Sequence, residues 1–130
     1  MAILAAVMAN GGVFQGSRIL SSATVDTLQS EPTERHMGFS VNYFSKGGVC
    51  VDLPLTVNVP RHRKMVVEGL QGCYGWMGYG GSLIQWHPET KLGFSFVPTF
   101  LYFIDVNNCR GKELLAEAIR CARIKTGSSR

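Results

Sequence analysis

The sequence predicts an α+β fold, an antiparallel sheet flanked by N- and C-terminal helices. Two observations support this prediction. Helix-forming residues occupy the start of the chain and residues 112–124, whereas segments of extended or alternating character fill the middle. A chain of 130 residues with 45% hydrophobic and 17% charged residues, and without an internal repeat or linker, has the balance of a single globular domain. Strands that arrive together with helices at both ends favour one sheet with helices packed on it.

The first twenty residues predict a helix followed by a small hairpin. Met1–Ala9 contains strong helix formers. Asn10-Gly11-Gly12 follows, and these residue types end a helix in the left-handed conformation. Val13-Phe14 and Arg18–Leu20 flank Gln15-Gly16-Ser17, so a short hairpin is expected here.

A second helix and a first sheet strand are expected next. Ser21 or Ser22 caps a helix that runs to about Gln29, and Glu31-Pro32 ends it because proline disfavours helical geometry in the preceding residue. Met37–Phe44 alternates in polarity, which predicts a half-buried strand. The face expected to be apolar carries Phe39, Val41 and Tyr43.

The middle of the chain is expected to be extended but peripheral. Lys46-Gly47-Gly48 predicts a turn, and Val49–Pro60 favours extended structure. Pro54 and Pro60 confine this piece to an edge strand or an ordered loop. Arg61–Lys64 is a basic run, interpreted first as a solvated loop and alternatively as a ligand-facing loop.

A hairpin and a helix are expected in the last third of the chain. Ser82–Trp86 and Leu92–Val97 predict two antiparallel strands, with His87 as a residue of the turn that joins them. Lys112–Ile124 predicts the clearest helix, with basic residues at its C-terminal end. Its apolar stripe comprises Leu114, Leu115, Ala118, Ile119 and Ala122. Residues 125–130 predict a polar, frayed tail.

Charge and polar residue patterns exclude several function classes. The formal net charge of +4 is too small and too dispersed to predict a nucleic-acid partner. No zinc-binding spacing links the cysteines, and His36 and His62 add none, so neither a metal nor a cofactor is expected. Reduced, mostly buried thiols are the favoured interpretation, with disulfides as the alternative in an oxidising compartment. The cysteines are Cys50, Cys73, Cys109 and Cys121.

Apolar segments of the chain predict neither export nor a membrane span. Met1–Ala9 lacks the positive region and the length of a signal peptide. The run from Leu92 to Ile104 is too short for a spanning helix and contains Pro98, so a buried strand leading into a second extended piece is expected. These features leave the compartment undetermined.

The most informative stretch runs from Met77 to Glu89. Its glycines stand immediately before an alternating apolar strand, where they weaken packing and increase the entropy lost on folding. A bulge or a closely approaching ligand explains them better than stability does. The stretch is therefore interpreted as one wall of an active site, with a plain glycine-rich turn as an equal alternative.

Two sets of motifs resemble the C-terminal part of the serine β-lactamase-like family, which includes class C β-lactamases, penicillin-binding DD-peptidases and related esterases. Leu4–Gly12, followed by Gly16–Ser21 and Thr24, is similar to the family's helix, "ANGG" turn and "G-x-R-L-L-S-x-x-T" continuation. Tyr79–Ser82, followed by Pro88-Glu89 and Leu92-Gly93-Phe94, resembles its third active-site strand and the following hairpin. The resemblance implies a partial β-lactamase or transpeptidase-like domain that covers most of the chain.

The resemblance also implies roles for four residues. The backbone N–H of Ser82 would be one of two oxyanion donors, while Gly80 and Gly81 would let a substrate lie against the backbone. Tyr79 stands where β-lactamases carry the motif's lysine, and it offers a hydroxyl and a ring but no fixed charge. An ester, amide or peptide is therefore the expected substrate. A partly buried sheet aromatic is the alternative interpretation of Tyr79.

The family's nucleophile and base are missing from this sequence. They come from an S-x-x-K motif, and no serine here precedes a lysine by three positions. Ser40-Val41-Asn42 matches the family's second motif formally, and Lys125-Thr126-Gly127 matches its third. Both are interpreted as chance matches, because the first lies in a predicted strand and the second follows the last helix.

The sequence therefore predicts a single partial domain over residues 1–130, the C-terminal portion of a β-lactamase-related serine hydrolase without its nucleophile-bearing N-terminal portion. Such a chain is expected to be inactive alone. Its open strand edge and apolar surface predict marginal solubility or self-association. The alternative is a non-enzymatic interaction module or pseudoenzyme that retains the sheet, and nucleic-acid binding through the basic residues is a weaker third hypothesis.

Overall fold

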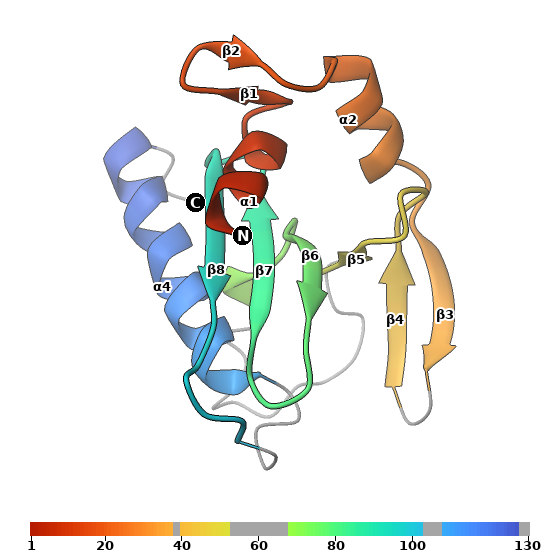
Figure 1. The fold of residues 1–130 in the computed structure, drawn as a ribbon, viewed down its shortest axis with the longest axis vertical. Helices are drawn as coiled ribbons and strands as arrows, with labels where there is room; N and C mark the ends of the chain where they lie inside the picture. The colour runs from red at the N-terminus through yellow and green to blue at the C-terminus, as the bar shows by residue number, and fades with distance from the viewer. Residues whose placement is uncertain (38–39, 53–67, 103–107, 128–130) are drawn as a thin grey trace.

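The computed structural model describes residues 1–37, 40–52, 68–102 and 108–127 (Figure 1). Six strands form one antiparallel sheet in the order β3-β4-β5-β6-β7-β8, in which each strand pairs with the next along the chain. The strands are β3 (Thr33–Met37), β4 (Ser40–Phe44), β5 (Cys50–Val51), β6 (Tyr74–Met77), β7 (Leu83–His87) and β8 (Leu92–Phe96). The predicted α+β class is confirmed.

The N-terminal helix and its end follow the prediction. Helix α1 (Ala2–Ala9) is closed by Gly11 and Gly12, whose φ angles are 60° and 88°. The Gly12 N–H donates to the carbonyl of Val7 at 2.8 Å and satisfies one of the helix's terminal acceptors. The predicted hairpin follows as a separate two-stranded sheet, β1 (Val13–Phe14) with β2 (Ser17–Arg18).

Helix α2 (Ser22–Gln29) begins and ends where the sequence predicts. The Ser21 hydroxyl accepts a hydrogen bond from the Thr24 N–H at 3.0 Å, which caps the first turn. Figure 1 shows α2 above the β3–β4 end of the sheet, while α1 crosses in front of β7 and β8. Both helices therefore precede the sheet in sequence but cover different parts of it.

The sheet contains two strands that the sequence did not predict and one that it placed wrongly. Thr33–Met37 forms edge strand β3, whose sequence is polar and therefore shows no apolar alternation. Met37 is the last residue of β3, whereas the prediction made it the first residue of the next strand. Tyr74–Met77 forms β6 although Gly75 interrupts its pattern. Cys50–Val51 lies inside the sheet between β4 and β6, so the predicted edge position is wrong. Both residues can pair because Pro54 comes only after them.

One face of the sheet packs against α1. Trp86 of β7 joins Ala5, Met8 and Ala9 of α1 in a buried cluster that also contains Val25 of α2. The close contact depends on Gly93 of β8, since a Cβ there would overlap the backbone of Ala5 and Ala6. Helix α1 is thus seated directly on the β7–β8 pair.

The opposite face packs against helix α4 (Cys109–Thr126). Leu115 and Ile119 are fully buried, and partly buried Leu92 and Phe94 of β8 pack against the cluster they form. Leu114 is 52% exposed, so its predicted place in the apolar stripe is wrong. Gly127, with φ of 71°, caps the helix. The sheet is consequently a middle layer between helices from the two ends of the chain.

Among the described residues, no helix combines the length and the apolar character required to cross a membrane.

Candidate functional site

The glycine-rich segment forms the turn of the β6–β7 hairpin. Met77 pairs with Leu83 as the last rung of the ladder, and the Gly78 N–H then donates to the Ser82 carbonyl at 2.8 Å. Tyr79–Gly81 closes the loop, and the φ angles of Gly80 and Gly81 are 90° and 109°. Residues with a Cβ rarely adopt these angles, so the turn requires both glycines. The segment leads into the strand rather than forming part of it.

The Ser82 amide lies at the point where this turn enters β7. Whereas Gly78 N–H is bonded to Ser82 O, the Ser82 N–H has no acceptor among the residues that the structure describes. A Cβ on Gly78 would lie 2.5 Å from Ser82 Oγ, so a side chain there would require the Ser82 hydroxyl to rotate away. A backbone donor of this kind can serve an external acceptor without breaking an existing bond.

The residues around this donor differ in exposure. Tyr79 is 70% exposed, which does not support its interpretation as a partly buried sheet aromatic. Gly80 and Gly81 are buried. The Tyr102 N–H donates to Gly80 O at 3.2 Å, and a Cβ on Gly80 would lie 2.8 Å from Leu101 Cδ2. The segment after β8 therefore lies directly against the turn.

Sequence reasoning missed the aromatic residues that accompany this contact. The run after Leu92 was predicted to continue as buried extended structure, but Phe100 and Leu101 are 66% and 67% exposed. The Phe100 and Tyr102 ring centroids lie 6.2 Å apart, and the Arg110 guanidinium lies 5.1 Å from the Tyr102 centroid. The available signal was Pro98, which ends the β8 pattern before these residues.

The remaining predicted motifs lie away from the turn. Ser40-Val41-Asn42 belongs to β4, which β5 and β6 separate from β7. Lys125 and Thr126 form the end of α4, with Gly127 as its cap. Their interpretation as chance matches agrees with these positions. The basic run Arg61–Lys64 lies outside the described residues.

A polar pair of a buried Gln85 and a partly buried Asp52 lies on the α4 face of the sheet. Gln85 of β7 reaches across β6 and donates from Nε2 to Asp52 Oδ2 at 2.8 Å. It can do so because Gly75 lies between them, where a Cβ would come 2.9 Å from Gln85 Cγ. Burial raises the pKa of the Asp52 carboxyl, against the opposing effects of Lys112 and the Gln85 hydrogen bond.

Burial also raises the pKa of the thiols of Cys50 and Cys73, and the neighbouring Asp52 carboxyl adds to both effects. These two cysteines are buried as predicted, while Cys109 is half-buried and Cys121 is exposed. None of the four forms a disulfide within the described part of the chain. The buried pair is therefore protonated at neutral pH and poorly suited to nucleophilic chemistry.

His87 ends β7 on the same face and is only 1% exposed. The Thr90 N–H donates to its Nδ1 at 3.3 Å, so Nε2 carries the proton and donates to the Gln71 carbonyl at 3.2 Å. Burial lowers the pKa of His87, as does the charge of Arg123. His87 is the last residue of β7 and pairs with Leu92, so its predicted place in the turn is wrong. Its neutral ring instead bonds to the turn that follows, through the Thr90 N–H.

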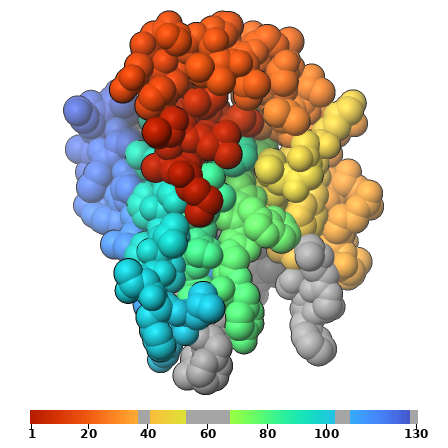
Figure 2. Space-filling view, in the orientation of Figure 1, coloured from red at the N-terminus to blue at the C-terminus, as the bar shows by residue number. Residues whose placement is uncertain are grey.

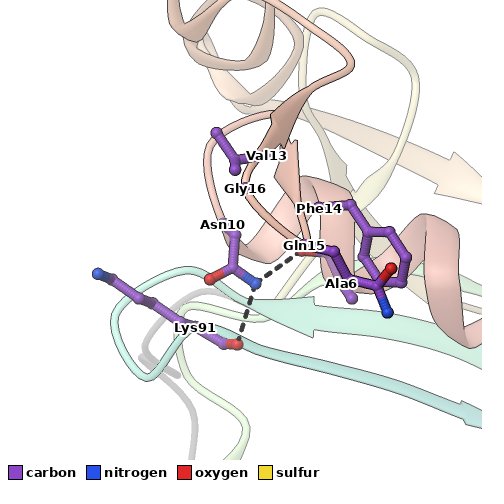
Figure 3. Close-up of a pocket in the computed structure, with 7 residues that line it drawn as sticks. All are labelled: Ala6, Asn10, Val13, Phe14, Gln15, Gly16 and Lys91. Atoms are coloured by element: carbon purple, nitrogen blue, oxygen red, sulfur yellow. Dashed lines mark hydrogen bonds between the residues drawn. The ribbon is translucent and has the colours of Figure 1, made fainter.

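A pocket lies at the other end of β7 from the Tyr79–Ser82 turn. It is open to solvent, has a volume of about 540 Å³, and lies between α1, the β1–β2 hairpin and Lys91 (Figure 3). Asn10 borders it and donates from Nδ2 to the carbonyls of Ala6 and Lys91 at 2.8 and 3.5 Å. The Asn10 amide thereby ties the end of α1 to the β7–β8 turn. A smaller apolar cavity of about 260 Å³ lies between α1 and the sheet, bordered by Trp76 and Trp86.

Within the described part of the chain, no cluster of three or more histidine, cysteine or acidic side chains could hold a metal ion. Comparisons of the chain with family models, curated proteins and solved structures found no match. The function is therefore argued from the geometry of the turn and from the motifs.

Proposed function

We propose that this chain supplies one wall of the acyl-transfer site of a β-lactamase-related serine hydrolase, with the Ser82 N–H as an oxyanion donor. The observation that carries the proposal is the Ser82 amide without an acceptor among the described residues, at the end of a turn built by Gly80 and Gly81. The order of the motifs and the sheet between α1 and α4 agree with the resemblance. The same proposal makes this chain the C-terminal portion of a β-lactamase or transpeptidase-like domain.

In the proposed reaction, this chain supplies the oxyanion donor and a separate segment supplies the nucleophile. A serine Oγ, deprotonated by its lysine partner, bonds to the substrate carbonyl carbon, and the carbonyl oxygen becomes an oxyanion. The Ser82 N–H donates to that oxygen and can stabilise the transition state by about 3 kcal/mol. The leaving group departs with the proton, and water then hydrolyses the acyl-serine. Because the chain contains no S-x-x-K motif, it is inactive by itself.

Tyr79 lies beside the donor and defines the substrate class. Its side chain is 70% exposed and presents a ring and a hydroxyl without fixed charge. A β-lactam carboxylate would lack its ammonium partner at this position. The proposed substrate is therefore an ester, amide or peptide.

A fluorophosphonate probe for activated serines tests the proposal. The isolated chain is expected to remain unlabelled, and labelling is expected when an S-x-x-K segment completes the site. In the complete site, Ser82→Pro removes the N–H and should lower the labelling rate about 100-fold. Ser82→Ala is the matched control, since it removes only the hydroxyl and should change the rate little. Labelling of the isolated chain, or equal rates for the two variants, would refute the proposal.

A non-enzymatic interaction module or pseudoenzyme is the second candidate. The observation in its favour is that α1 is apolar all round yet leaves Ile3 and Leu4 61% and 58% exposed. The same surface favours self-association of the isolated chain. A monodisperse monomer with one cooperative thermal transition would contradict the expected self-association.

A further inference from the structure

The cavity between α1 and the sheet is lined by apolar residues. Leu4 and Met8 of α1 border it on one side, and Trp76 of β6 borders it on the other, together with Ile84 and Trp86 of β7. None of the described residues that line it is charged. Leu4 is 58% exposed and Trp76 is 44% exposed, so the cavity reaches the surface where these two side chains lie.

The start of α1 adjoins this cavity. Met1 and Ile3, which we call the α1 tip, are 66% and 61% exposed, and Ile3 directly precedes Leu4 at the cavity rim. Figure 2 shows the start of the chain (red) on the face toward the viewer, beside the segment of β6 and β7 (green). An exposed apolar tip and an apolar cavity therefore lie next to each other on one face.

The composition of this face favours a protein side chain as the occupant of the cavity. Small-molecule sites combine apolar walls with a few polar groups that fix the orientation of the ligand. Among the described residues that border this cavity, only the two indoles carry a side-chain nitrogen or oxygen. Helices that lie on membranes carry lysine or arginine on their polar face, and α1 contains neither. Tryptophan and methionine are instead enriched in protein interfaces, where charged residues are depleted.

We propose that two copies of the chain form a symmetric dimer in which the α1 tip of each copy inserts into the cavity of the other. A two-fold interface uses the same patch twice, so the patch has to complement itself. An apolar tip beside an apolar cavity has this property, and two uncharged patches do not repel each other.

The size of the cavity agrees with such an insertion. A cavity of about 150 Å³ in a protein core can bind benzene, so the volume of about 260 Å³ has room for the Ile3 side chain. The resulting dimer is closed, whereas pairing through open strand edges can continue into larger assemblies. This inference does not depend on the proposed acyl-transfer function.

Sedimentation analysis of the chain over a range of concentrations tests the dimer. A single monomer–dimer equilibrium is expected. Ile3→Glu places a charge at the inserted tip and should raise the dimer dissociation constant at least about 30-fold. Ile124→Glu is the matched control, because Ile124 is also 61% exposed but belongs to α4, which packs on the opposite face of the sheet. It should leave the dissociation constant unchanged.

A substitution inside the cavity distinguishes insertion from general adhesion of an apolar helix. Ile84→Phe enlarges a side chain of the cavity wall and leaves the α1 tip unchanged, so it should raise the dissociation constant about tenfold. A helix that only adheres would lose affinity in Ile3→Glu and keep it in Ile84→Phe. Thermal melting of each variant reports its folding. Val49→Phe, which enlarges another residue of the cavity wall, replaces Ile84→Phe if that variant is unfolded.

Four results would overturn the proposed dimer. The first three are a monomer at every concentration, larger assemblies that persist in Ile3→Glu, and equal dissociation constants for the parent chain and the folded cavity variant. The fourth is binding of a monomeric chain to phosphatidylcholine vesicles that Ile3→Glu abolishes, which would assign this face to a membrane surface.

Discussion

The polar groups at the two ends of strand β7 differ in whether they have hydrogen-bond partners. At the end that meets β8, the buried His87 ring has a partner for each nitrogen, Thr90 on one side and the Gln71 carbonyl on the other. At the end that meets β6, the Ser82 N–H has no partner among the described residues, and Tyr79 is largely exposed. Both ring nitrogens are bonded at the first end, whereas a backbone donor at the second end lacks an acceptor within the described part of the chain.

Under the proposed function, this difference separates residues that stabilise the fold from residues that act on a substrate along one strand. A buried histidine with both nitrogens bonded contributes to stability and has no free position for chemistry. An open backbone donor contributes little to stability, yet it can bind a developing charge. Substitutions at the His87 end are therefore expected to change the free energy of unfolding, and those at the Ser82 end to change function.

The largest effect on stability is expected from His87→Ala. The change creates a cavity and leaves the Gln71 carbonyl and Thr90 N–H without their partner, for a loss of about 2–4 kcal/mol. Urea denaturation monitored by circular dichroism measures it. Glu89→Gln is the control, because Glu89 is exposed and its contact with His87 Nε2 is 3.8 Å long. A loss below about 1 kcal/mol for His87→Ala would remove the distinction between the two turns.

The next effect is a dependence of stability on pH. Because the pKa of His87 is lowered in the folded state, the unfolded chain binds the proton more readily. The stability from neutral His87 is thus complete above pH 6.5, the ordinary value, and is lost as pH falls through the lowered pKa. Unfolding free energies at pH 5 and 7.5 measure the loss.

His87→Gln should lack this contribution because glutamine does not titrate. The raised pKa of Asp52 acts in the opposite direction, since its contribution is present below pH 3.8 and is lost as pH rises through the folded-state pKa. Asp52→Asn removes this titrating carboxyl and its pH-dependent contribution to stability. The asparagine side-chain oxygen can still accept the hydrogen bond from Gln85. An unchanged acid loss in His87→Gln would show that another group is responsible.

The same strand shows how far sequence reasoning reaches. Local chemistry predicted α2, whose Ser21 cap is formed by neighbouring residues, and the β7–β8 hairpin, although His87 ends the strand and does not lie in the turn. Sequence reasoning missed β6, because a glycine at position 75 interrupts the strand pattern. The reason for this glycine is visible only in the structure, where the Gln85 side chain passes over Gly75 to reach Asp52. That contact joins positions 33 residues apart, so no local pattern contains it.

For the candidate site, too, some residues could be predicted from the sequence and others could not. Its glycines and Ser82 could be named from the sequence, since turn chemistry is local. The exposed cluster at Phe100–Tyr102 could not, because its position depends on the contact between Gly80 and Leu101. Apolar composition alone favoured burial there.

A smaller effect on stability is expected at the open end, from Ser82→Pro. Proline removes an N–H that has no acceptor among the described residues, so the free energy of unfolding should change by no more than about 1 kcal/mol. Thermal melting of Ser82→Pro beside Ser82→Ala measures it. A loss comparable to that of His87→Ala would mean that this amide is part of the fold's own bonding and is unavailable to a substrate.

The smallest effect is expected from Tyr79→Ala. Tyr79 is 70% exposed, so the change should alter stability by no more than about 0.5 kcal/mol. In the complete catalytic site it should instead raise KM for an ester substrate, because the side chain offers its ring and hydroxyl to the bound molecule. Parallel measurement of melting and of hydrolysis gives both quantities. Reduced stability with unchanged hydrolysis would make Tyr79 a structural residue and would remove the difference between the two ends of β7 at this position.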